Sequence, residues 1–321
     1  SSCRPSEAIR YRRRSIATPN IIGMELRIHI IDAALCGYEY SGLPKLLDAI
    51  ESKRNLLPRT PMKVIKETPV SIVYEGGNNI GMLAIQRLGE AVLAKALVSG
   101  FAIGGVQNSW MSGRGAHYVE KLVNQDLVVI HTVSSQSYVA PLGGIESILG
   151  TNPLTIGLPT ANGPLIFDMG TSAIMYTDLT LRERRGEKLP EGVAIDVQGN
   201  PTTDPTAARE GALLPFAGHK GFGLALMMHA MGLLTGAGTT ADKNNGHVII
   251  AFKPDLMYST EQYKEDVSAL LNRIKTSKRA AGVGEIRIPS ERSFKERARN
   301  LKEGLEFDTA VFNRLRAFAG V

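Results

Sequence analysis

The stretch NPLTIGLPTANGPLIFDMGTS (residues 152–172) decides the fold class, because it brings two strand patterns together without a helix between them. The short apolar runs 152–160 and 163–172 are typical of strands. The turn-forming residues 161–163 join them. Two strands joined this way form a hairpin, so a regular alternation of strands and helices is not expected.

The remaining elements mix strands and helices irregularly, which predicts an α+β fold. Apolar runs predict strands, and helical spacing with a glycine C-cap such as Gly100 predicts helices. We expect strands over 69–77, 101–108, 126–135 and 246–254, and helices within 20–55 and over 79–100, 116–125, 218–237, 259–279 and 291–319. The Pro/Gly/Thr-rich stretch 199–210 is expected to be a loop.

Two glycine-rich segments fail the test for a Rossmann dinucleotide site, which requires G-x-G-x-x-G between a strand and a helix. EGGNNIG (75–81) stands between a predicted strand and a predicted helix, but its glycines are wrongly spaced. In GHKGFG (218–223) the spacing is reversed. The sequence has no P-loop either, so any nucleotide must be bound in another way.

The composition is that of a soluble globular protein, and 321 residues predict two linked domains. Only two cysteines, no long apolar span and no secretory pattern predict a cytoplasmic protein without a membrane segment. Net charge is +6, and five arginines lie within residues 4–14. We expect a solvated terminus there rather than a nucleic-acid site.

His219 and Lys220 stand between glycines just before an apolar helix. Glycines let the backbone approach a ligand, and free N–H groups at a helix N-terminus favour an anion. Lys220 adds a positive charge suited to phosphate. The alternative is that the glycines allow close helix packing and that the two basic side chains are solvated.

Three other stretches carry polar residues beside apolar elements. Thr151 and Asn152 precede a strand and are able to donate to a carboxylate or amide, whereas Asp168 ends a strand and is either a turn cap or a site acid. Asn108–Gly113 follows a strand, with His117 in the next helix as a group that titrates near neutrality. A last cluster lies at a helix break and consists of Tyr38, Tyr40, Ser41 and Lys45.

Four histidines have no partners at metal-ligand spacing and are expected to be structural: His29, His131, His229 and His247.

In order and wording, these stretches resemble the malate/L-lactate dehydrogenase family, which binds NAD(P)H without a Rossmann domain. The resemblance covers roughly residues 20–320 and includes activities on ureidoglycolate, sulfolactate, diketogulonate and cyclic imino acids. It is carried by VAPLGGIESILGTNPLTIGLP (139–159), PLIFDMGTSAI (164–174), LPEGVAIDVQGNPTTDP (189–205), LLPFAGHKGFGLALM (213–227) and IRIPSERS (286–293).

The resemblance implies a helical domain from both chain ends (1–70 plus 286–321) and a mostly antiparallel sheet domain (71–285) that carries the cofactor. It also implies a homodimer and a small carboxylate substrate. Thr151 and Asn152 are implied at the substrate and nicotinamide end, and His219 and Lys220 at the phosphates or ribose. The full set of implied cofactor-binding residues is Ser109, Ser112, Ser134, Thr151, Asn152, Phe167, Asp168, Met169, Thr171, His219 and Lys220.

The chain departs from the family where the family carries its catalytic histidines. Gly-x-x-Ser-His-Gly-x-x-Arg is the usual pattern, but Ser41 stands in place of the histidine and Lys45 in place of the arginine that clamps the substrate carboxylate. Met111 replaces a second histidine. Serine alone is too weak an acid to protonate an alkoxide, although it can relay a proton from another group. The candidate catalytic residues are therefore Ser41, Lys45, Asp168 and His117, with Tyr38 and Tyr40 as further possible donors.

Two functions fit this pattern. The first is NAD(P)H-dependent reduction of a small 2-oxo acid or cyclic 2-imino acid; a protonated imine relaxes the need for a donor. The second is a diverged NAD(P)-binding protein that acts as a sensor or partner. The choice between NADH and NADPH stays open, because the charged run 182–188 suits either a 2′-phosphate contact or a solvated loop.

Overall fold

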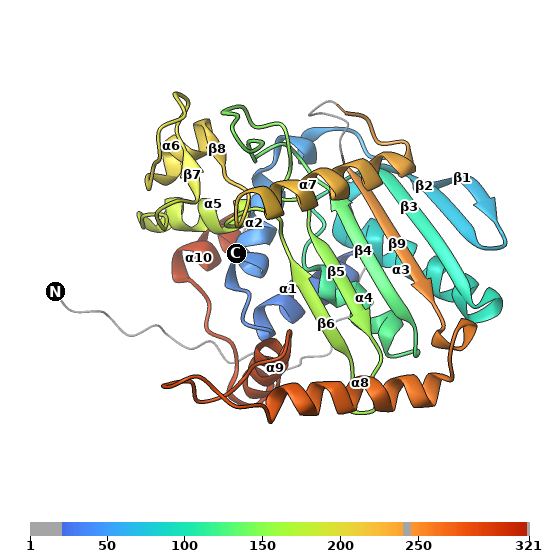
Figure 1. Cartoon of the computed structure of the whole chain (residues 1–321). Coiled ribbons are helices and arrows are strands. Elements are labelled where there is room, and N and C mark those ends of the chain that lie inside the picture. The colour runs from blue at the N-terminus through green and yellow to red at the C-terminus, as the bar shows by residue number, and fades with distance from the viewer. Residues whose placement is uncertain (1–20, 240–244, 320–321) are drawn as a thin grey trace. The chain divides into compact units, whose positions relative to one another are not determined.

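A computed structural model describes residues 21–239 and 245–319 of the chain (Figure 1). The arginine-rich stretch at residues 4–14 lies outside the described residues. The chain divides into two compact units, one made of the residues up to Leu57 and from Glu291 on, the other of Pro58–Ser290. Among the described residues, no helix has both the length and the apolar character needed to cross a membrane.

The larger unit is built on a seven-stranded sheet with the strand order β1-β2-β3-β9-β4-β5-β6. Only β2 and β3 pair in parallel, and every other neighbouring pair is antiparallel. The expected hairpin is formed by the strands Leu154–Leu158 and Leu165–Met169. The strands are β1 (Lys63–Thr68), β2 (Ser71–Ile80), β3 (Phe101–Trp110), β4 (Val128–Ser134), β5 (Leu154–Leu158), β6 (Leu165–Met169) and β9 (Gly246–Phe252).

Helices cover both faces of this sheet (Figure 1). Two neighbouring residues of β4 contact different helices. His131 faces α4 (Gly115–Val123), because a Cβ on Gly115 would lie 3.3 Å from its ring. Thr132 faces α7 (His219–Gly232), because its hydroxyl donates to the sulfur of Met228. Because successive strand residues point to opposite faces, α4 and α7 lie on opposite sides of the sheet. Helix α3 (Gly81–Ser99) packs on the α4 side and ends at Gly100, whose φ of 76° confirms the expected C-cap.

The rest of this unit includes two short helices that the sequence analysis missed. Helix α5 (Tyr176–Arg185) includes the first half of the charged run 182–188, and α6 (Pro205–Glu210) lies in the expected loop. Helix α6 forms because Asp204 caps it through the N–H of Thr206 and Pro205 takes its first position. The remaining elements are the β7 (Ala194–Ile195) and β8 (Ala212–Leu213) pair, η3 (Leu233–Thr235), η4 (Pro254–Leu256) and α8 (Thr260–Lys275).

The smaller unit is helical and joins the two ends of the described chain. Asp32 accepts from Arg297 at 3.1 Å, the carbonyl of Leu35 accepts from Asn300, and Glu51 accepts from Arg314 at 2.9 Å. Its elements are α1 (Ile21–Leu35), η1 (Glu39–Ser41), α2 (Leu43–Glu51), η2 (Lys53–Leu56), α9 (Glu291–Glu303) and α10 (Thr309–Ala319). Strand β1 pairs with β2 in the sheet, and the chain passes from one compact unit to the other between Leu57 and Pro58.

Candidate active site

One edge of the sheet collects most of the candidate residues of the larger unit. Strands β3, β4 and β6 end at this edge and β9 and β5 begin there, as the pairings Gln107–Gly246, Ser134–Gly246 and Leu154–Met169 require. The segments that hold Ser109, Ser112, Ser134, Thr151, Asn152, Met169 and Thr171 therefore converge. This convergence follows from the antiparallel register, which places the end of one strand beside the start of the next.

Thr171 and Asn152 hold this edge together through bonds within the protein. The Thr171 hydroxyl donates to the carbonyls of Thr151 and Asn152 at 3.1 and 3.3 Å. The Asn152 amide donates to the carbonyl of Ala225 on α7 at 2.9 Å and accepts from the N–H of Ser135. Asn152 thus fastens α7 to the sheet, and at least part of its hydrogen-bonding capacity is used for packing rather than for a ligand.

The N-terminus of α7 lies beside the end of β6, because the N–H of Phe216 donates to the carbonyl of Thr171. Gly218, with φ 58° and ψ −119°, turns the chain into the helix, a conformation that favours glycine. The side chains of His219 and Lys220 are exposed and form no hydrogen bond or ion pair with other described residues. Their backbone N–H groups have no acceptor within the helix, so this end of α7 presents donors and a cation to an anionic ligand.

Asp168 has both carboxylate oxygens occupied. One accepts from the N–H of Ala116 in the first turn of α4 at 2.8 Å, and the other accepts from the hydroxyl of Thr155 at 2.9 Å. Burial raises the pKa of Asp168, while these two bonds and the charge of Arg114 act in the opposite direction. These contacts are those of a helix cap supplied from a distant strand.

Phe167 and Met169 point away from Asp168, because alternate strand residues face opposite sides of the sheet. Phe167 is 40% exposed, so it offers an apolar surface on the α7 side. The expected run of three cofactor-lining residues is therefore divided between the two faces. Only Phe167 and Met169 share the α7 side.

His117 is buried in α4 and lies edge-to-face against Tyr118, with ring centroids 5.6 Å apart. Tyr118 also packs on His131 and donates to the carbonyl of Ser112. Burial raises the pKa of Tyr118 well above its ordinary value, so its hydroxyl stays protonated. The loop that carries Ser112 is thereby fixed to α4.

Ser109 and Ser134 are also buried. Ser134 accepts from the N–H of Gly246 at 2.9 Å and packs against Gly232, near the end of α7. The Ser109 hydroxyl has no hydrogen-bond partner among the described residues. Of these two candidate cofactor residues, Ser134 is engaged in packing and Ser109 retains its hydrogen-bonding capacity.

Ser41 and Lys45 belong to the helical unit, where Gly42 separates η1 from α2. Both side chains are buried, with exposed fractions of 6% and 8%. Burial lowers the pKa of Lys45 to about 8, and the Asp48 carboxylate opposes this shift. Nearby, Tyr38 and Tyr40 make an edge-to-face contact, and the guanidinium of Arg292 lies over the Tyr38 ring.

The polar cluster around Asp168 was not predicted from the sequence. His131, Thr155 and Asp168 are aligned across β4, β5 and β6, and buried Arg114 adds a positive charge. A Cβ on Gly115 would collide with the Thr155 hydroxyl, so only glycine fits at this crossing. The signal in the sequence was the alternation that puts His131 and Thr155 on inward positions of neighbouring strands.

His131 and His247 are buried on the same side of the sheet, and burial lowers their pKa values to about 4 and about 3. Both imidazoles are therefore neutral at physiological pH. The described residues contain no group of three or more side chains placed to hold a metal ion.

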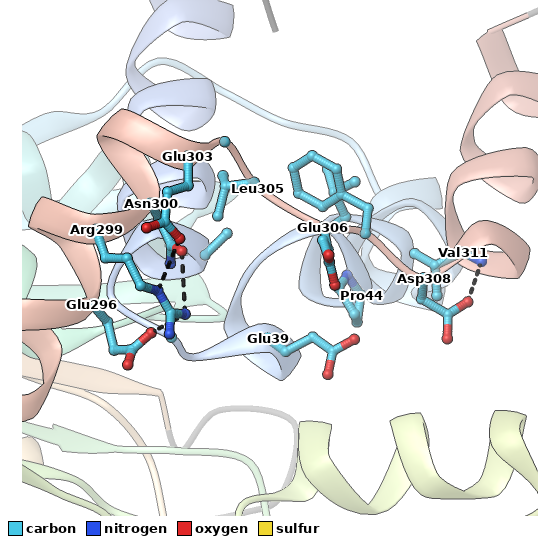
Figure 2. Close-up of a pocket in the computed structure, with 15 residues that line it drawn as sticks. Glu39, Pro44, Glu296, Arg299, Asn300, Glu303, Leu305, Glu306, Asp308 and Val311 are labelled. Atoms are coloured by element: carbon cyan, nitrogen blue, oxygen red, sulfur yellow. Dashed lines mark hydrogen bonds and ion pairs between the residues drawn. The ribbon is translucent and has the colours of Figure 1, made fainter. Parts of the chain in front are cut away.

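A cavity of about 550 Å³ opens in the helical unit, and its charged lining residues are all acidic except Arg299 (Figure 2). Arg299 pairs with Glu296 at 2.5 Å and lies 3.9 Å from Glu303. The other acids in the lining are Glu39, Glu306 and Asp308. This excess of carboxylates disfavours an anionic ligand, so the cavity is not where a small acid is expected to bind.

The comparisons with known proteins cover nearly the whole chain. The sequence profile described as malate/L-lactate dehydrogenase matches residues 25–316. The L-sulfolactate dehydrogenase of Methanocaldococcus jannaschii is 33% identical over 298 residues, which are 89% of this chain and 86% of that protein. The Delta(1)-pyrroline-2-carboxylate/Delta(1)-piperideine-2-carboxylate reductase of Pseudomonas syringae is 31% identical over 264 residues, 76% of this chain and 73% of that protein.

The fold agrees with these sequence matches. The structure of the sulfolactate dehydrogenase of M. jannaschii superposes with a TM-score of 0.81 at 31% identity, covering 94% of this chain and 91% of the other. The malate dehydrogenase of Pyrococcus horikoshii gives 0.81 at 28% identity, with coverages of 94% and 89%. The predicted α+β class with a mostly antiparallel, non-Rossmann sheet is confirmed, and the chain is a dehydrogenase of the malate/L-lactate dehydrogenase family, whose members use a nicotinamide cofactor.

Proposed function

We propose that the chain is an NAD(P)H-dependent reductase of a small 2-oxo acid or cyclic 2-imino acid. The observation that carries the proposal is the N-terminus of α7, where the exposed side chains of His219 and Lys220 have no partner among the described residues and stand beside free N–H groups and a glycine turn. This arrangement fits the pyrophosphate of a dinucleotide. The relatives support both substrate classes, since one is named for sulfolactate and another for cyclic imino acids.

Several candidate residues contribute to this function. When bound, the reduced nicotinamide supplies a hydride to the C=O or C=N carbon. Phe167 and Met169 offer it an apolar surface on the α7 side, and Ser109 offers a buried hydroxyl that has no partner among the described residues. Lys45 pairs with the substrate carboxylate as a point charge. Asp168 acts by holding the first turn of α4, which carries His117.

The absence of a histidine at position 41 favours the imine branch of this proposal. Reduction of a ketone leaves an alkoxide, which requires a proton from an acid with a pKa near the working pH. Reduction of a protonated imine leaves a neutral amine and requires no added proton. Ser41 is buried and contributes a hydroxyl that relays or positions but does not act as the acid.

A homodimer is part of the proposal. Helix α7 and the following η3 leave large apolar side chains exposed, namely Leu226, Met227, Leu233 and Leu234. Leu234 is 68% exposed, and solvent-exposed apolar groups gathered on one element are typical of protein contacts. Light scattering of the purified protein measures the oligomeric state, and a monomer at micromolar concentration contradicts this part of the proposal.

The direct test incubates the purified protein with NADH or NADPH and a panel of acids. The panel contains the 2-oxo counterparts of malate, lactate and sulfolactate and the two cyclic imino acids named for the relatives. Oxidation of the cofactor is followed by its absorbance, and binding of each cofactor by its fluorescence. We expect turnover of one panel member with one preferred cofactor.

Silence across the panel with the cofactor bound refutes the reductase and favours the diverged NAD(P)-binding protein. In that case the double variant Ser41→His, Met111→His is the next measurement, because it restores both family histidines. Activity gained by this variant shows that the loss of imidazoles, and not the loss of the cofactor site, ended catalysis.

A further inference from the structure

The Lys45 side chain is a buried cation that has no bonded partner among the described residues. Its exposed fraction is 8%, and it forms no hydrogen bond or ion pair with other residues of the described chain. A buried ammonium without a counterion destabilises the folded protein, because burial removes its hydration and nothing replaces it. Such a group either loses its proton or is stabilised by a bound anion.

The charges on the elements packed around α2 do not supply that anion. On α1, Asp32 is paired with Arg297. The same helix carries buried His29 and Glu25, which has a buried carboxylate oxygen without a hydrogen-bond partner among the described residues, but neither is a cause of the pKa shift of Lys45. On α10, Arg314 is paired with Glu51 of α2 itself. Tyr40 and the exposed Glu39 lie on η1, Lys53 and Arg54 lie on η2, and the Asp48 carboxylate is the one charge that acts on the pKa of Lys45.

A lysine and an arginine differ in a buried anion site. A guanidinium keeps its charge at every accessible pH, whereas an ammonium gives up its proton when burial lowers its pKa. For Lys45 that pKa is about 8, so without a bound anion the side chain loses its charge as the pH rises through about 8. A bound anion stabilises the charged form and raises the pKa again.

We propose that a small carboxylate binds at Lys45 together with a proton, so that the protonation of this side chain controls the affinity of the site for acids. The inference rests on the proposed function, which brings a carboxylate substrate to this position. Above the pKa, the site takes up one proton from solution for each carboxylate bound: a neutral amine, a carboxylate anion and a proton become an ammonium–carboxylate pair. No bond to carbon forms or breaks.

The experiment measures the binding of oxamate, a non-reacting analogue of a 2-oxo acid, by calorimetry. The protein is saturated with the reduced cofactor that it binds, and the titration is repeated at several pH values in two buffers with different ionisation enthalpies. We expect Kd to weaken about tenfold between about pH 7 and about pH 9, since the charged fraction falls by that factor around a pKa of about 8. Proton uptake should rise from about one tenth to most of one proton per oxamate.

Three variants separate this inference from a general effect of pH on the protein. Lys45→Arg keeps the charge, so its oxamate affinity should not change over the same pH range. Lys45→Met should not bind oxamate at any pH, while its cofactor affinity stays that of the wild type. Lys53→Met removes an exposed lysine from η2 and should behave as the wild type.

The possible failures are distinguishable. A wild-type affinity that stays constant with pH, or a Lys45→Arg variant that keeps the pH dependence, overturns the inference. Cofactor binding without any oxamate binding also overturns it, because Lys45 is then not an acid site. No cofactor binding refutes the proposed function instead, and the ¹⁵N resonance of the Lys45 amine is then titrated with and without oxamate. A titration midpoint near pH 8 that oxamate raises supports the inference, and one that oxamate leaves unchanged overturns it.

Discussion

The side chains of Lys45 and Lys220 both lack a hydrogen bond or ion pair with other described residues, but their surroundings are opposite. Lys45 is buried on a short amphipathic helix of the helical unit, and burial lowers its pKa to about 8. Lys220 is exposed in the first turn of α7, beside a glycine with φ 58° and free backbone donors. One cation is held away from water, and the other remains hydrated.

The difference decides what each lysine is suited to bind. An exposed ammonium keeps its charge and its water, so it gains a modest, salt-sensitive attraction to a phosphate. A buried ammonium has already lost its hydration, so an anion that reaches it gains a strong interaction, at the cost of a site that destabilises the free protein. The first arrangement suits a large dinucleotide with several other contacts, and the second suits the single carboxylate of a small acid.

The largest expected effect of a single substitution is a gain of stability in Lys45→Met. Folding lowers the pKa of Lys45 from 10.5 to about 8, so the folded chain binds this proton less tightly than the unfolded chain does. The penalty is fully present below about pH 8 and disappears as the pH rises from there to the unfolded pKa. Removing the charge should stabilise the protein by up to about 3 kcal/mol at neutral pH and progressively less in alkali.

Urea unfolding of the wild type and Lys45→Met at neutral and alkaline pH measures this gain. Lys53→Met is the matched control, because Lys53 is exposed in the same unit and its removal should leave the free energy of unfolding within about 0.5 kcal/mol. A Lys45→Met variant less stable than the wild type at neutral pH shows that the ammonium has a favourable partner, and the contrast between the two lysines is then wrong.

Lys220→Met should weaken the binding of the cofactor without a comparable change in the stability of the protein. A charge-assisted bond to phosphate contributes about 1.5–3 kcal/mol, so we expect the Kd of the bound dinucleotide to rise about 10- to 100-fold. Lys220→Arg should keep most of the affinity, and Lys302→Met, at an exposed position of α9, should change nothing. Fluorescence titration gives the three values. An unchanged Kd in Lys220→Met places the phosphates elsewhere.

Most of the fold could be predicted from the sequence, because its signals are local. The hairpin of β5 and β6 follows from two apolar runs around a three-residue turn, and Gly100 ends α3 as a C-cap. Helix α6 was missed because its cap and proline lie in a stretch whose composition is typical of loops. A single capping interaction outweighed that average composition.

The site was less predictable, because its chemistry depends on partners far apart in the chain. Asp168 has its pKa set by burial and by bonds from Ala116 and Thr155, which no spacing in the sequence reveals. The glycines around Lys220 did indicate an accessible helix N-terminus. For Lys45 the sequence indicated only a cation, and its burial, which determines its chemistry, depends on packing in three dimensions.

The smallest expected effect is that of ionic strength on ligand binding. Its measurement compares the two lysines in the wild-type protein. Salt screens exposed charges over a Debye length of about 10 Å at 0.1 M and buried pairs much less. Raising the salt concentration from about 0.05 M to about 0.5 M should weaken dinucleotide binding about three- to tenfold and oxamate binding at neutral pH less than about twofold. Calorimetry in chloride and in acetate separates screening from competition, because a small carboxylate competes directly for Lys45. Equal salt dependence for the two ligands means that Lys45 is open to solvent when oxamate binds, and its burial then has no influence on the affinity of the site.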